Sequence, residues 1–550
     1  MSKDTLVQLS LRSNPLIVIP TGAVTRKRDR RSGGICCLFA VPRISSVCTL
    51  CALLALTLLA GCGGKPDPHT AVLLIESSPT NLDPRIGVDA QSERIDMLIF
   101  DSLVKKDESY KLQPWLAKSW DQPDPVTYIF HLRSGVRFHN GQPLTSADVK
   151  WTIDSAHNGT VITAKSGTFI QVDHIDAPDP LTCIVHLKKP DPFLLWNLSD
   201  GALGIVPAGS GKDFWRHPIG TGAYKFVSQQ QDKEVILERN HDSWQPEPSI
   251  PRLRFNVVPD DTTRALELQK GSADVEINAL EPDTVHALRA NPQLEIESTP
   301  GTIVNYINLN LRDPYLRDVR VRQAVAMSIN RQLILDTIWR GEARLADDLL
   351  PPGHWARTEE IAHYPYDLAK ANALLDAAGY RRGPDGIRFH LEMKISNAKN
   401  PTRLMALVVQ QELRAVGIAM DVRLYEFGTF FADVTKGAFG MYALRWVGGN
   451  ESPDIFRLAY TAASLPPHGA NRGHYLNPEL DALMADAAAS TTQDQARADY
   501  VKVQQILARD VPTIPLWYQD NVVVHTRRMQ NIRVDASGNY DFLKTATLTR

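Results

Sequence analysis

The sequence has few cysteines once its N-terminal region is set aside. Five of the six cysteines lie within the first 62 residues, and the sixth is Cys183. A chain that begins at Cys62 therefore keeps only Cys62 and Cys183, and no disulfide is available if Cys62 is modified. Cys183 lies in the apolar run from Leu181 to Val185, which predicts a buried strand residue. This use of cysteine agrees with an exported chain that carries no disulfide.

The chain also lacks an excess of charge. Its 60 basic and 62 acidic residues give a formal net charge of −2 at pH 7. A protein that binds nucleic acid or an acidic membrane surface is expected to carry strong positive charge. The sequence therefore predicts no nucleic-acid partner. Its apolar content of 43% is ordinary for a globular chain with a full core.

Motifs of common catalytic and cofactor sites are missing. The chain contains no His-Glu-x-x-His and no Gly-x-Ser-x-Gly. The run Gly209-Ser210-Gly211-Lys212 is followed by Asp213, so it lacks the hydroxyl that a phosphate loop offers to Mg²⁺. Gly220-Thr221-Gly222 lacks the third glycine of a dinucleotide fingerprint. We expect no catalytic residue, cofactor or metal, although a triad assembled only in space leaves no such motif.

A short apolar run near the N-terminus predicts export. Basic residues cluster at positions 26–31, and an uncharged run follows from Val47 to Ala60. This run is shorter than the roughly 20 residues of a spanning helix and fits the apolar core of a signal peptide. It ends in Leu59-Ala60-Gly61-Cys62, which resembles a lipobox. We expect residues 1–61 to be a signal peptide, Cys62 to carry acyl chains, and residues 62–70 to be a tether.

Hydrophobic periodicity predicts α/β lobes, in which helices cover sheets. Alternation over residues 128–138, with glycine turns at Gly135 and Gly141, predicts a hairpin. A capping box at Thr145 and Asp148 opens a helix. Apolar residues spaced by four between Asp318 and Gly341 predict one helix. Further helices are expected over 367–379 and 404–411, after Asn477-Pro478 and over 494–510, and strands over 71–75, 418–424 and 514–524.

Several short segments carry a resemblance to a known family. They are NLDP at 81–84, FDSLV at 100–104, LQPWLAKSW at 112–120, FHLRSGVRFHNG at 130–141, LTSADV at 144–149, PIGTGAY at 218–224, VRQAV at 321–325 and YDLAKA at 366–371. In this order they make the chain from about Ala71 resemble the solute-binding proteins of peptide and nickel ABC importers, the oligopeptide- and dipeptide-binding family.

The resemblance implies an α/β fold of the periplasmic-binding-protein type, with two large lobes that close on a cleft and a smaller third lobe. Lobe I is expected to combine residues 71–107, 216–302 and 513–550. Residues 108–215 are expected to form the small extra lobe, and residues 303–512 lobe III. The crossings between the large lobes are expected near residues 299–306 and 510–515, where Pro300-Gly301 and Pro512 punctuate the chain.

The resemblance also implies a ligand site. Residues 442–454 resemble the family's cleft segment Trp-x-x-Asp-x-x-(Asp/Glu)-Pro, in which Trp446 matches the Trp. The Asp that pairs with a free ligand amino group falls on Gly449 here. A buried ammonium without a carboxylate partner is costly, so such a ligand requires Glu451 or Asp454 as a substitute.

The remaining candidate ligand-binding residues come from the same resemblance. They are Gly448, Gly449 and Asn450 beside Trp446, Arg403 as a partner for a ligand carboxylate, Tyr306 and Asn308 on the hinge-side strand, and Asn81 near the cleft mouth. Trp446 as a core residue and Arg403 as a solvated residue at a helix start remain open alternatives.

The expected function is that of an exported lipoprotein that captures a peptide or peptide-like solute and delivers it to the permease subunits of an ABC importer. We expect a periplasmic or extracytoplasmic monomer, anchored to the membrane by lipid, and no enzyme. The alternatives are a solute sensor or folding helper on the same fold, and a periplasmic hydrolase. The ligand stays open among oligopeptide, dipeptide, nickel chelate and other small solutes.

Overall fold

The computed structural model describes residues 67–549 except for 108, 192, 200–202, 397–399, 449–450, 467–468 and 491. These residues belong to one compact unit, Pro66–Arg550. The expected signal peptide, Cys62 and the first part of the tether lie outside them. Within the described ranges, every helix is too short or too polar to cross a membrane.

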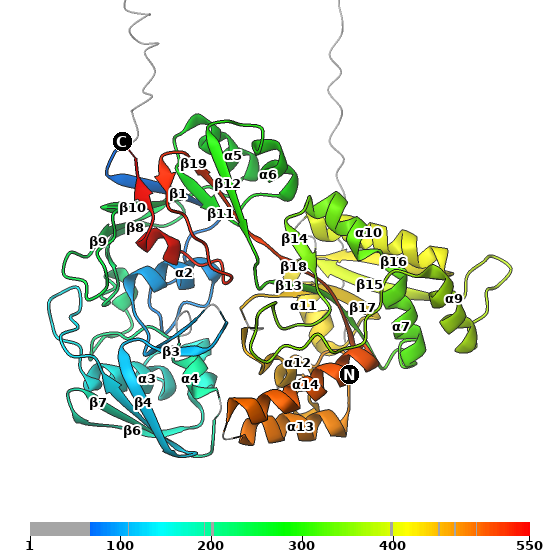
Figure 1. The fold of residues 1–550 in the computed structure, drawn as a ribbon, viewed down its shortest axis with the longest axis horizontal. Coiled ribbons are helices and arrows are strands. Elements are labelled where there is room, and N and C mark those ends of the chain that lie inside the picture. Colours follow the sequence, from blue (N-terminus) through cyan, green and yellow to red (C-terminus); the bar gives the residue numbers. More distant parts are fainter. Residues whose placement is uncertain are drawn as a thin grey trace, which may run out of the picture. The chain divides into compact units, whose positions relative to one another are not determined.

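The first large lobe, here called lobe I, is built on a seven-stranded sheet in the order β12-β19-β11-β1-β10-β9-β8 (Figure 1). Its strands are β1 (Thr70–Ile75), β8 (Tyr224–Gln230), β9 (Glu234–Arg239), β10 (Arg252–Val257), β11 (Val275–Ile277), β12 (Leu294–Thr299) and β19 (Asn521–Thr526), and its helices are α2 (Ala90–Ile99), α5 (Asp261–Lys270) and α6 (Pro282–Leu288). Alternate residues of β1 enter two cores, because Leu73 packs in the core that includes α2 and Leu74 in the core under α5 and α6.

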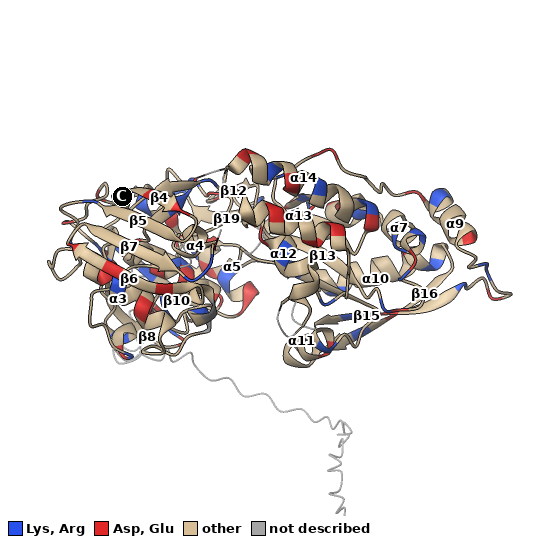
Figure 2. Ribbon diagram, turned by 90° about the horizontal axis from the view of Figure 1, so that it is seen from below, with Lys and Arg blue, Asp and Glu red and all other residues tan. Residues whose placement is uncertain are grey.

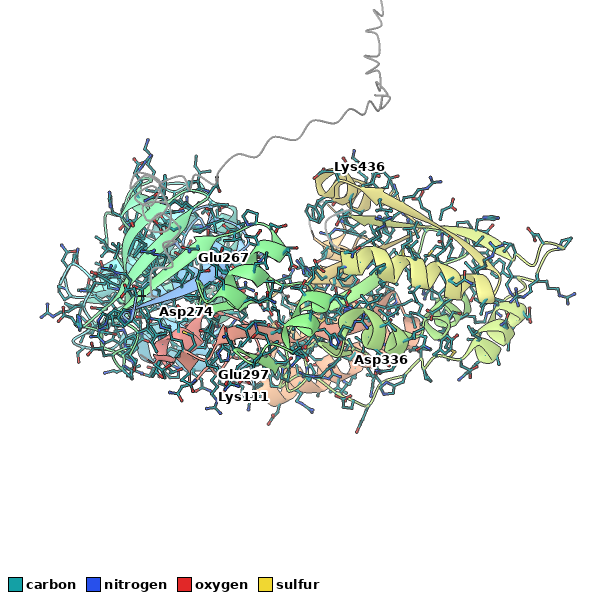
Figure 3. The ribbon with its side chains drawn as sticks, turned by 90° about the horizontal axis from the view of Figure 1, so that it is seen from above. Lys111, Glu267, Asp274, Glu297, Asp336 and Lys436 are labelled. Carbon is teal, nitrogen blue, oxygen red and sulfur yellow. The ribbon has the colours of Figure 1, made fainter. Side chains whose placement is uncertain are left out.

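The C-terminal segment closes lobe I. It contains β20 (Met529–Gln530), the short helix η6 (Asp541–Lys544) and β21 (Thr547–Leu548). Asp274, labelled in Figure 3, accepts a hydrogen bond of 2.8 Å from the backbone N–H of Val72 and pairs with Arg528 at 2.9 Å. This carboxylate therefore ties β1 to the C-terminal segment.

A smaller lobe carries a four-stranded antiparallel sheet in the order β4-β5-β7-β6. Its elements are β4 (Ala117–Asp124), β5 (Thr127–Leu132), β6 (Val172–Asp179), β7 (Thr182–Leu187), α3 (Ser146–His157), α4 (Leu194–Asn197), η1 (Ala164–Phe169) and η2 (Phe214–Arg216), and β2 (Val104–Lys106) pairs with β3 (Leu112–Pro114) beside it. The capping box of α3 is confirmed. Cys183 is confirmed as a buried residue of β7, and burial raises the pKa of its thiol to about 12.

The hairpin predicted over residues 128–138 is wrong in its second half. β5 forms as expected, but its two edges are occupied by β4 and β7. Val136 and Phe138 instead enter the small lobe's core from a loop, and only Arg137 forms a bridge there, with Pro143. The alternation of apolar residues correctly predicted which side chains are buried, but it could not predict which strands pair.

The second large lobe, lobe III, carries a six-stranded sheet in the order β14-β18-β13-β17-β15-β16. Its strands are β13 (Val304–Leu309), β14 (Ala343–Leu345), β15 (Phe389–Ser396), β16 (Ile418–Tyr425), β17 (Met441–Trp446) and β18 (Thr513–Gln519). Its helices are α7 (Val319–Ser328), α8 (Arg331–Ile334), η3 (Leu335–Trp339), α9 (Leu368–Ala377), α10 (Asn400–Ala415), α11 (Phe427–Lys436), α12 (Ile455–Tyr460), η5 (Ala462–Ser464), α13 (Pro478–Ala489) and α14 (Gln493–Asp510). One face of the sheet packs with α7, α9 and α10, and the other with α11 to α14.

The single helix predicted between Asp318 and Gly341 is also wrong. Asp318 does cap its start, but α7 ends at Ser328, and Ile329 adopts an extended backbone. The Asn330 side chain accepts a hydrogen bond from the backbone N–H of Leu333 and starts a new helix. A local cap therefore overrides the apolar spacing across this junction.

Two neighbouring strand connections join the sheets of lobes I and III. β12 pairs antiparallel with β19 as far as Thr299 and Asn521, and β13 pairs with β18 from Val304 and Tyr518 onward. β18 therefore lies in the lobe III sheet, and the second crossing follows Gln519 instead of lying at residues 510–515. The two crossings approach so closely at Gly301 that a Cβ atom there would lie 2.2 Å from the Gln519 carbonyl oxygen. A residue without a Cβ atom is therefore required at this position.

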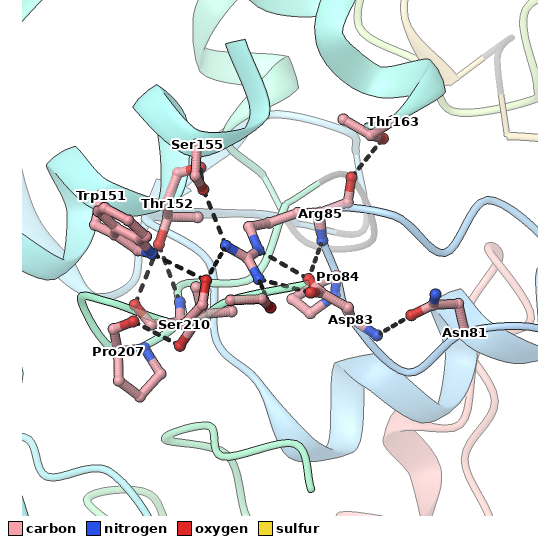
Figure 4. A network of polar contacts seen from close by, with 12 residues as sticks. Asn81, Asp83, Pro84, Arg85, Trp151, Thr152, Ser155, Thr163, Pro207 and Ser210 are labelled. Atoms are coloured by element: carbon pink, nitrogen blue, oxygen red, sulfur yellow. Dashed lines mark hydrogen bonds and ion pairs between the residues drawn. The ribbon is translucent and has the colours of Figure 1, made fainter. Parts of the chain in front are cut away.

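A buried ion pair joins lobe I to the small lobe (Figure 4). Asp83 and Arg85 are 2.7 Å apart, and both side chains are fully buried. Arg85 also donates to the Ser155 hydroxyl in α3 and to the Ser210 carbonyl, both at 3.0 Å. The guanidinium therefore satisfies partners on three separate segments, which a buried charge requires.

We predict that Arg85→Ala lowers the free energy of unfolding by about 3–5 kcal/mol, because it leaves the Asp83 carboxylate buried and unpaired. Urea unfolding followed by circular dichroism measures the change. Lys502→Ala is the matched control, since Lys502 forms an exposed pair with Asp499 at 3.1 Å and its loss is expected to cost less than about 1 kcal/mol. Equal effects of the two changes would contradict the assigned role of Arg85.

Candidate functional site

Three strands of lobe III end at the same edge of its sheet. β15 is parallel to both β16 and β17, so their carboxyl ends, Ser396, Tyr425 and Trp446, lie along one edge. Trp446 is paired with Val304, the first residue of β13 after the crossing from lobe I. Ligands of open α/β sheets bind outside the carboxyl ends of parallel strands, which makes this edge the candidate site.

A cavity of about 200 Å³ lies at this edge. It is lined by Asn305, Tyr306, Trp339, Ser396, Pro401, Thr402, Met405, Phe427, Ala443, Leu444, Arg445, Leu516, Trp517 and Gln519. Aromatic and aliphatic side chains thus form most of the wall, and Arg445 is the one charged residue among these. Such a lining, mostly apolar with a few polar groups, is typical of small-molecule sites.

A second cavity of about 80 Å³ adjoins the first and reaches lobe I. The two share Trp339, Pro401, Arg445 and Gln519, while Asn278 to Val285 contribute the lobe I side of the second. We call the two cavities together the cleft. The lining of the second cavity includes three carboxylates. Glu342 forms an ion pair with Arg289, Asp520 lies 2.9 Å from Arg344, and Glu281 is the third.

Arg445 is the charged group that both cavities share. Its side chain is accessible to water, but the surrounding protein reduces its hydration and so lowers the pKa of its guanidinium. Glu76, which follows β1, acts against this shift, and Arg94 of α2 adds to it. Gln91 holds Glu76 with a hydrogen bond of 2.9 Å. The guanidinium stays charged in either case.

Three residues of the first cavity have hydrogen-bond donors without a partner in the described protein. These donors are the side-chain amide nitrogen of Asn305 and the indole N–H groups of Trp339 and Trp517. A buried donor that makes no hydrogen bond costs about 1–3 kcal/mol. All three nitrogens are buried within the protein, so they do not face the open space of the cavity.

Trp446 and Tyr306, both expected at the site, lie together. Their rings are stacked with centroids 6.0 Å apart. Tyr306 is 2% exposed and lines the first cavity, whereas Trp446 is half-buried and packs against the cores of lobe III. Because alternate strand residues point to opposite faces, Trp446 lies on the face of β17 opposite to Arg445.

The other expected residues are dispersed. Gly448 is exposed in the turn after β17, and Gly449 and Asn450 lie outside the described residues. Arg403 is exposed in the first turn of α10 and is not among the lining residues of the cleft.

Two more of the expected residues are held within the protein. Asn308 is buried and donates to the Thr513 hydroxyl at 3.2 Å. Asn81 accepts a hydrogen bond of 3.0 Å from the backbone N–H of Asp83, beside the ion pair that joins lobe I to the small lobe. Neither residue is in the lining of the cleft.

The two carboxylates considered as substitutes at Gly449 are engaged by the protein. Glu451 is 4% exposed, lies 2.7 Å from the Lys106 ammonium and accepts a hydrogen bond of 3.1 Å from the Thr302 hydroxyl. Asp454 forms an ion pair with Arg457 at 2.5 Å. Both carboxylates already have cationic partners in this arrangement.

The Lys106–Glu451 pair is part of a contact that joins lobe III to the segments before and within the small lobe. His354 lies against the Glu451 backbone, with 3.1 Å between its Nε2 atom and the carbonyl oxygen. The His354 ring also stacks on Tyr110, with centroids 5.5 Å apart. Burial lowers the pKa of His354 to about 4, so the imidazole that makes this contact is neutral at pH 7.

Sequence reasoning missed most of the wall. Arg445 and Asn305 stand next to Trp446 and Tyr306 in segments that the resemblance singled out, yet they lie on the opposite faces of their strands. The alternation of side chains along each strand was the signal that could have pointed to Arg445 and Asn305. Trp339 and Trp517 come from distant segments and are placed in the cavity only by tertiary packing.

The model of the bacterial extracellular solute-binding proteins, family 5, matches residues 111–464. Among curated relatives, di/tripeptide-binding protein 1 of Pseudomonas aeruginosa is 28% identical, over 86% of this chain and 93% of its own length.

Solved structures show the same fold. NikA from Brucella suis in complex with Fe(III)-EDTA aligns with a TM-score of 0.80 at 23% identity, covering 87% of this chain and 100% of its own. DppA from Helicobacter pylori in complex with the peptide STSA aligns with a TM-score of 0.71 at 26% identity, covering 88% and 98%. The α/β fold of the periplasmic-binding-protein type, with two large lobes and a smaller third one, is thereby confirmed.

We predict that His354 makes stability depend on pH. Its pKa in the folded protein lies below the usual value of about 6.5, so its contribution is complete above pH 6.5 and is lost as the pH falls toward 4. The unfolding free energy of the wild type, minus that of His354→Gln, should therefore shrink over this range, by up to about 3 kcal/mol. Urea unfolding at several pH values measures this difference.

The control is His390→Gln, because His390 is an exposed residue of β15 that lies outside the contact with Tyr110 and Glu451. Parallel pH profiles for the wild type and His354→Gln would contradict the prediction.

Proposed function

Because the chain belongs to the bacterial extracellular solute-binding proteins of family 5, we propose that it captures a peptide or peptide-like solute in the cleft and delivers it to an ABC importer. The observation that carries this proposal is the cavity at the carboxyl ends of β15 and β17, with its apolar wall and its few polar groups. The relatives named for di/tripeptides and for the peptide STSA support a peptide-like ligand.

The single charged residue that lines the first cavity, Arg445, favours a ligand that is held by a carboxylate. Arg445 lies where the two cavities meet and has no ion pair among the described residues. A guanidinium binds a carboxylate through charge-assisted hydrogen bonds.

A free ligand ammonium finds less support. Gly449 occupies the position at which the family resemblance places an amine-binding Asp, while Glu451 and Asp454 are paired with Lys106 and Arg457. The Glu76 carboxylate is the one whose charge acts on the pKa of Arg445, and it accepts a hydrogen bond from the Gln91 side chain. We therefore infer an acidic solute whose amino end is blocked, absent or left in solvent.

Capture follows from a change in population. The paired crossings after β12 and β18 are the connections about which lobes I and III move. A solute shifts the protein toward the closed form only by the extra affinity that it has for that form. Contacts from both lobes to one ligand supply that difference, and the importer recognises the closed arrangement.

Export and anchoring complete the proposal. The lipobox-like run ending at Cys62 supports cleavage before this residue and acylation of it. Several acyl chains, at about 0.8 kcal/mol for each buried CH₂, hold a protein firmly at a membrane. Charges of both signs are interspersed over the lobes (Figure 2), which agrees with anchoring by lipid and not by a basic surface.

We predict that dipeptides bind through their carboxylate. An equimolar pool of dipeptides is prepared in four forms: unblocked, N-acetylated, C-amidated, and blocked at both ends. Isothermal titration calorimetry measures the affinity of the protein for each form. The two forms with a free carboxylate should bind at least about tenfold more tightly than the two amidated forms, because a charged hydrogen bond contributes about 1.5–3 kcal/mol. Arg445→Gln should remove this preference, and Glu76→Gln should keep it.

Arg414→Gln is the matched control, because Arg414 is exposed near the end of α10 and lies outside the cleft lining. It should leave every affinity unchanged. Failure of all four forms to bind would contradict peptide capture itself. Binding that requires the free amino group, or a carboxylate preference that survives Arg445→Gln, would contradict only the assignment of the ligand end.

A further inference from the structure

We propose a binding site for a divalent transition-metal ion on the outer face of the small lobe, formed by His174, Asp176 and His186. One ligand atom from each residue lies within 4.8 Å of the other two. The Asp176 carboxylate lies 3.4 Å from Nε2 of His186 and 3.8 Å from Nε2 of His174. Ligand atoms that surround a tetrahedral ion at about 2.0–2.1 Å are about 3.3 Å apart, close to the spacing between the Asp176 and His186 atoms, and rotation of the imidazole rings directs their nitrogen atoms at one ion.

The pairing of β6 with β7 builds this cluster. His174 lies directly opposite His186, and Asp176 follows two residues later on the same face. The rings of the two histidines are stacked with centroids 4.3 Å apart and planes 12° apart. A cross-strand pair together with a residue two positions along is a compact arrangement on a sheet face.

A bulge in β6 turns His174 outward. The register shifts between Val172 and His174, so that Asp173 is an extra residue relative to β7. Without it, strict alternation would place His174 on the same face as the buried Val172. With it, Asp173 and His174 are both exposed. Bulges of this kind redirect side chains next to functional sites.

The extra residue also orients the imidazole. The Asp173 carboxylate lies 2.8 Å from Nδ1 of His174. Since a carboxylate only accepts, Nδ1–H donates to it, and the lone pair of the neutral ring lies on Nε2, which is the atom near Asp176. A carboxylate behind a histidine ligand is a recurrent feature of metal sites, where it fixes the tautomer and raises the basicity of the ligand.

The donor set selects the class of ion. Two imidazoles and one carboxylate suit Zn²⁺, Ni²⁺ and Cu²⁺, whereas Mg²⁺ and Ca²⁺ prefer oxygen ligands alone. Three protein ligands leave at least one position for water or a further ligand. None of the three residues lines the cleft, so this site is separate from solute capture and does not depend on the proposed function.

The test is calorimetric titration of the purified protein with ZnCl₂, and with MgCl₂ for comparison. We expect one equivalent of Zn²⁺ to bind reversibly, EDTA to remove it, and Mg²⁺ not to compete. Asp173→Asn should weaken Zn²⁺ binding by about 10–100-fold, as the loss of an outer-shell partner does, and His186→Ala should weaken it more. Co²⁺ provides a second readout, because its visible absorption reports the coordination geometry.

His131→Ala is the matched control. His131 lies on the same sheet in β5 and contacts one carboxylate, that of Asp121 at 2.8 Å, but it is not part of the cluster. This variant should keep the wild-type affinity for Zn²⁺, and His186→Ala should keep the wild-type affinity for dipeptides. Absence of saturable Zn²⁺ binding, or binding that is unchanged in both His174→Ala and His186→Ala, would overturn the proposal.

Discussion

The close approach of two chain crossings is the constraint on which the rest of the structure depends. The segment from β12 to β13 and the segment from β18 to β19 run side by side, so each of the large sheets continues into the other through a pair of antiparallel strands. Gly301 has room only for a hydrogen atom against the Gln519 carbonyl. The chain therefore passes between lobes I and III at one place, and the cleft lies beside it, where β15 and β17 end.

The position of the cleft explains its chemistry. The crossing brings Asn305 and Gln519 to the wall from two strands, and β17 brings Arg445 beside them. In the second cavity Glu342 and Asp520 are paired with Arg289 and Arg344, and Glu281 is a third carboxylate of its lining, whereas Arg445 has no ion pair among the described residues. Arg445 is the one charged residue in the lining of the first cavity, and it is this charge that relates the fold to an acidic solute.

Local signals in the sequence were enough for elements whose ends are set by their own residues. The capping box at Thr145, the cap at Asp367 and the Asn477-Pro478 start all open helices in the structure. Where the outcome depends on partners far along the chain, local signals failed. The edges of β5 were taken by β4 and β7, and β18 and β19, predicted as one strand-like segment, belong to two different sheets.

The candidate site divides in the same way. The family resemblance led to the segments that contain Trp446 and Tyr306, whose rings do stack. It could not place Arg445 in the cavity, because the face of a strand that meets a ligand depends on which helices cover the other face. Trp339 and Trp517 reach the wall through η3 and β18, and no spacing in the sequence relates these two elements.

The central claim is that this chain carries an acidic, peptide-like solute, and native mass spectrometry of the protein purified from its own host tests it most directly. We expect a fraction of the protein to retain one small molecule, which on release is identified as a peptide or peptide-like compound with a free carboxylate, and we expect Arg445→Gln protein prepared in the same way to lose it. Retention of a solute without any anionic group, or of the same solute by the Arg445→Gln protein, would contradict the account.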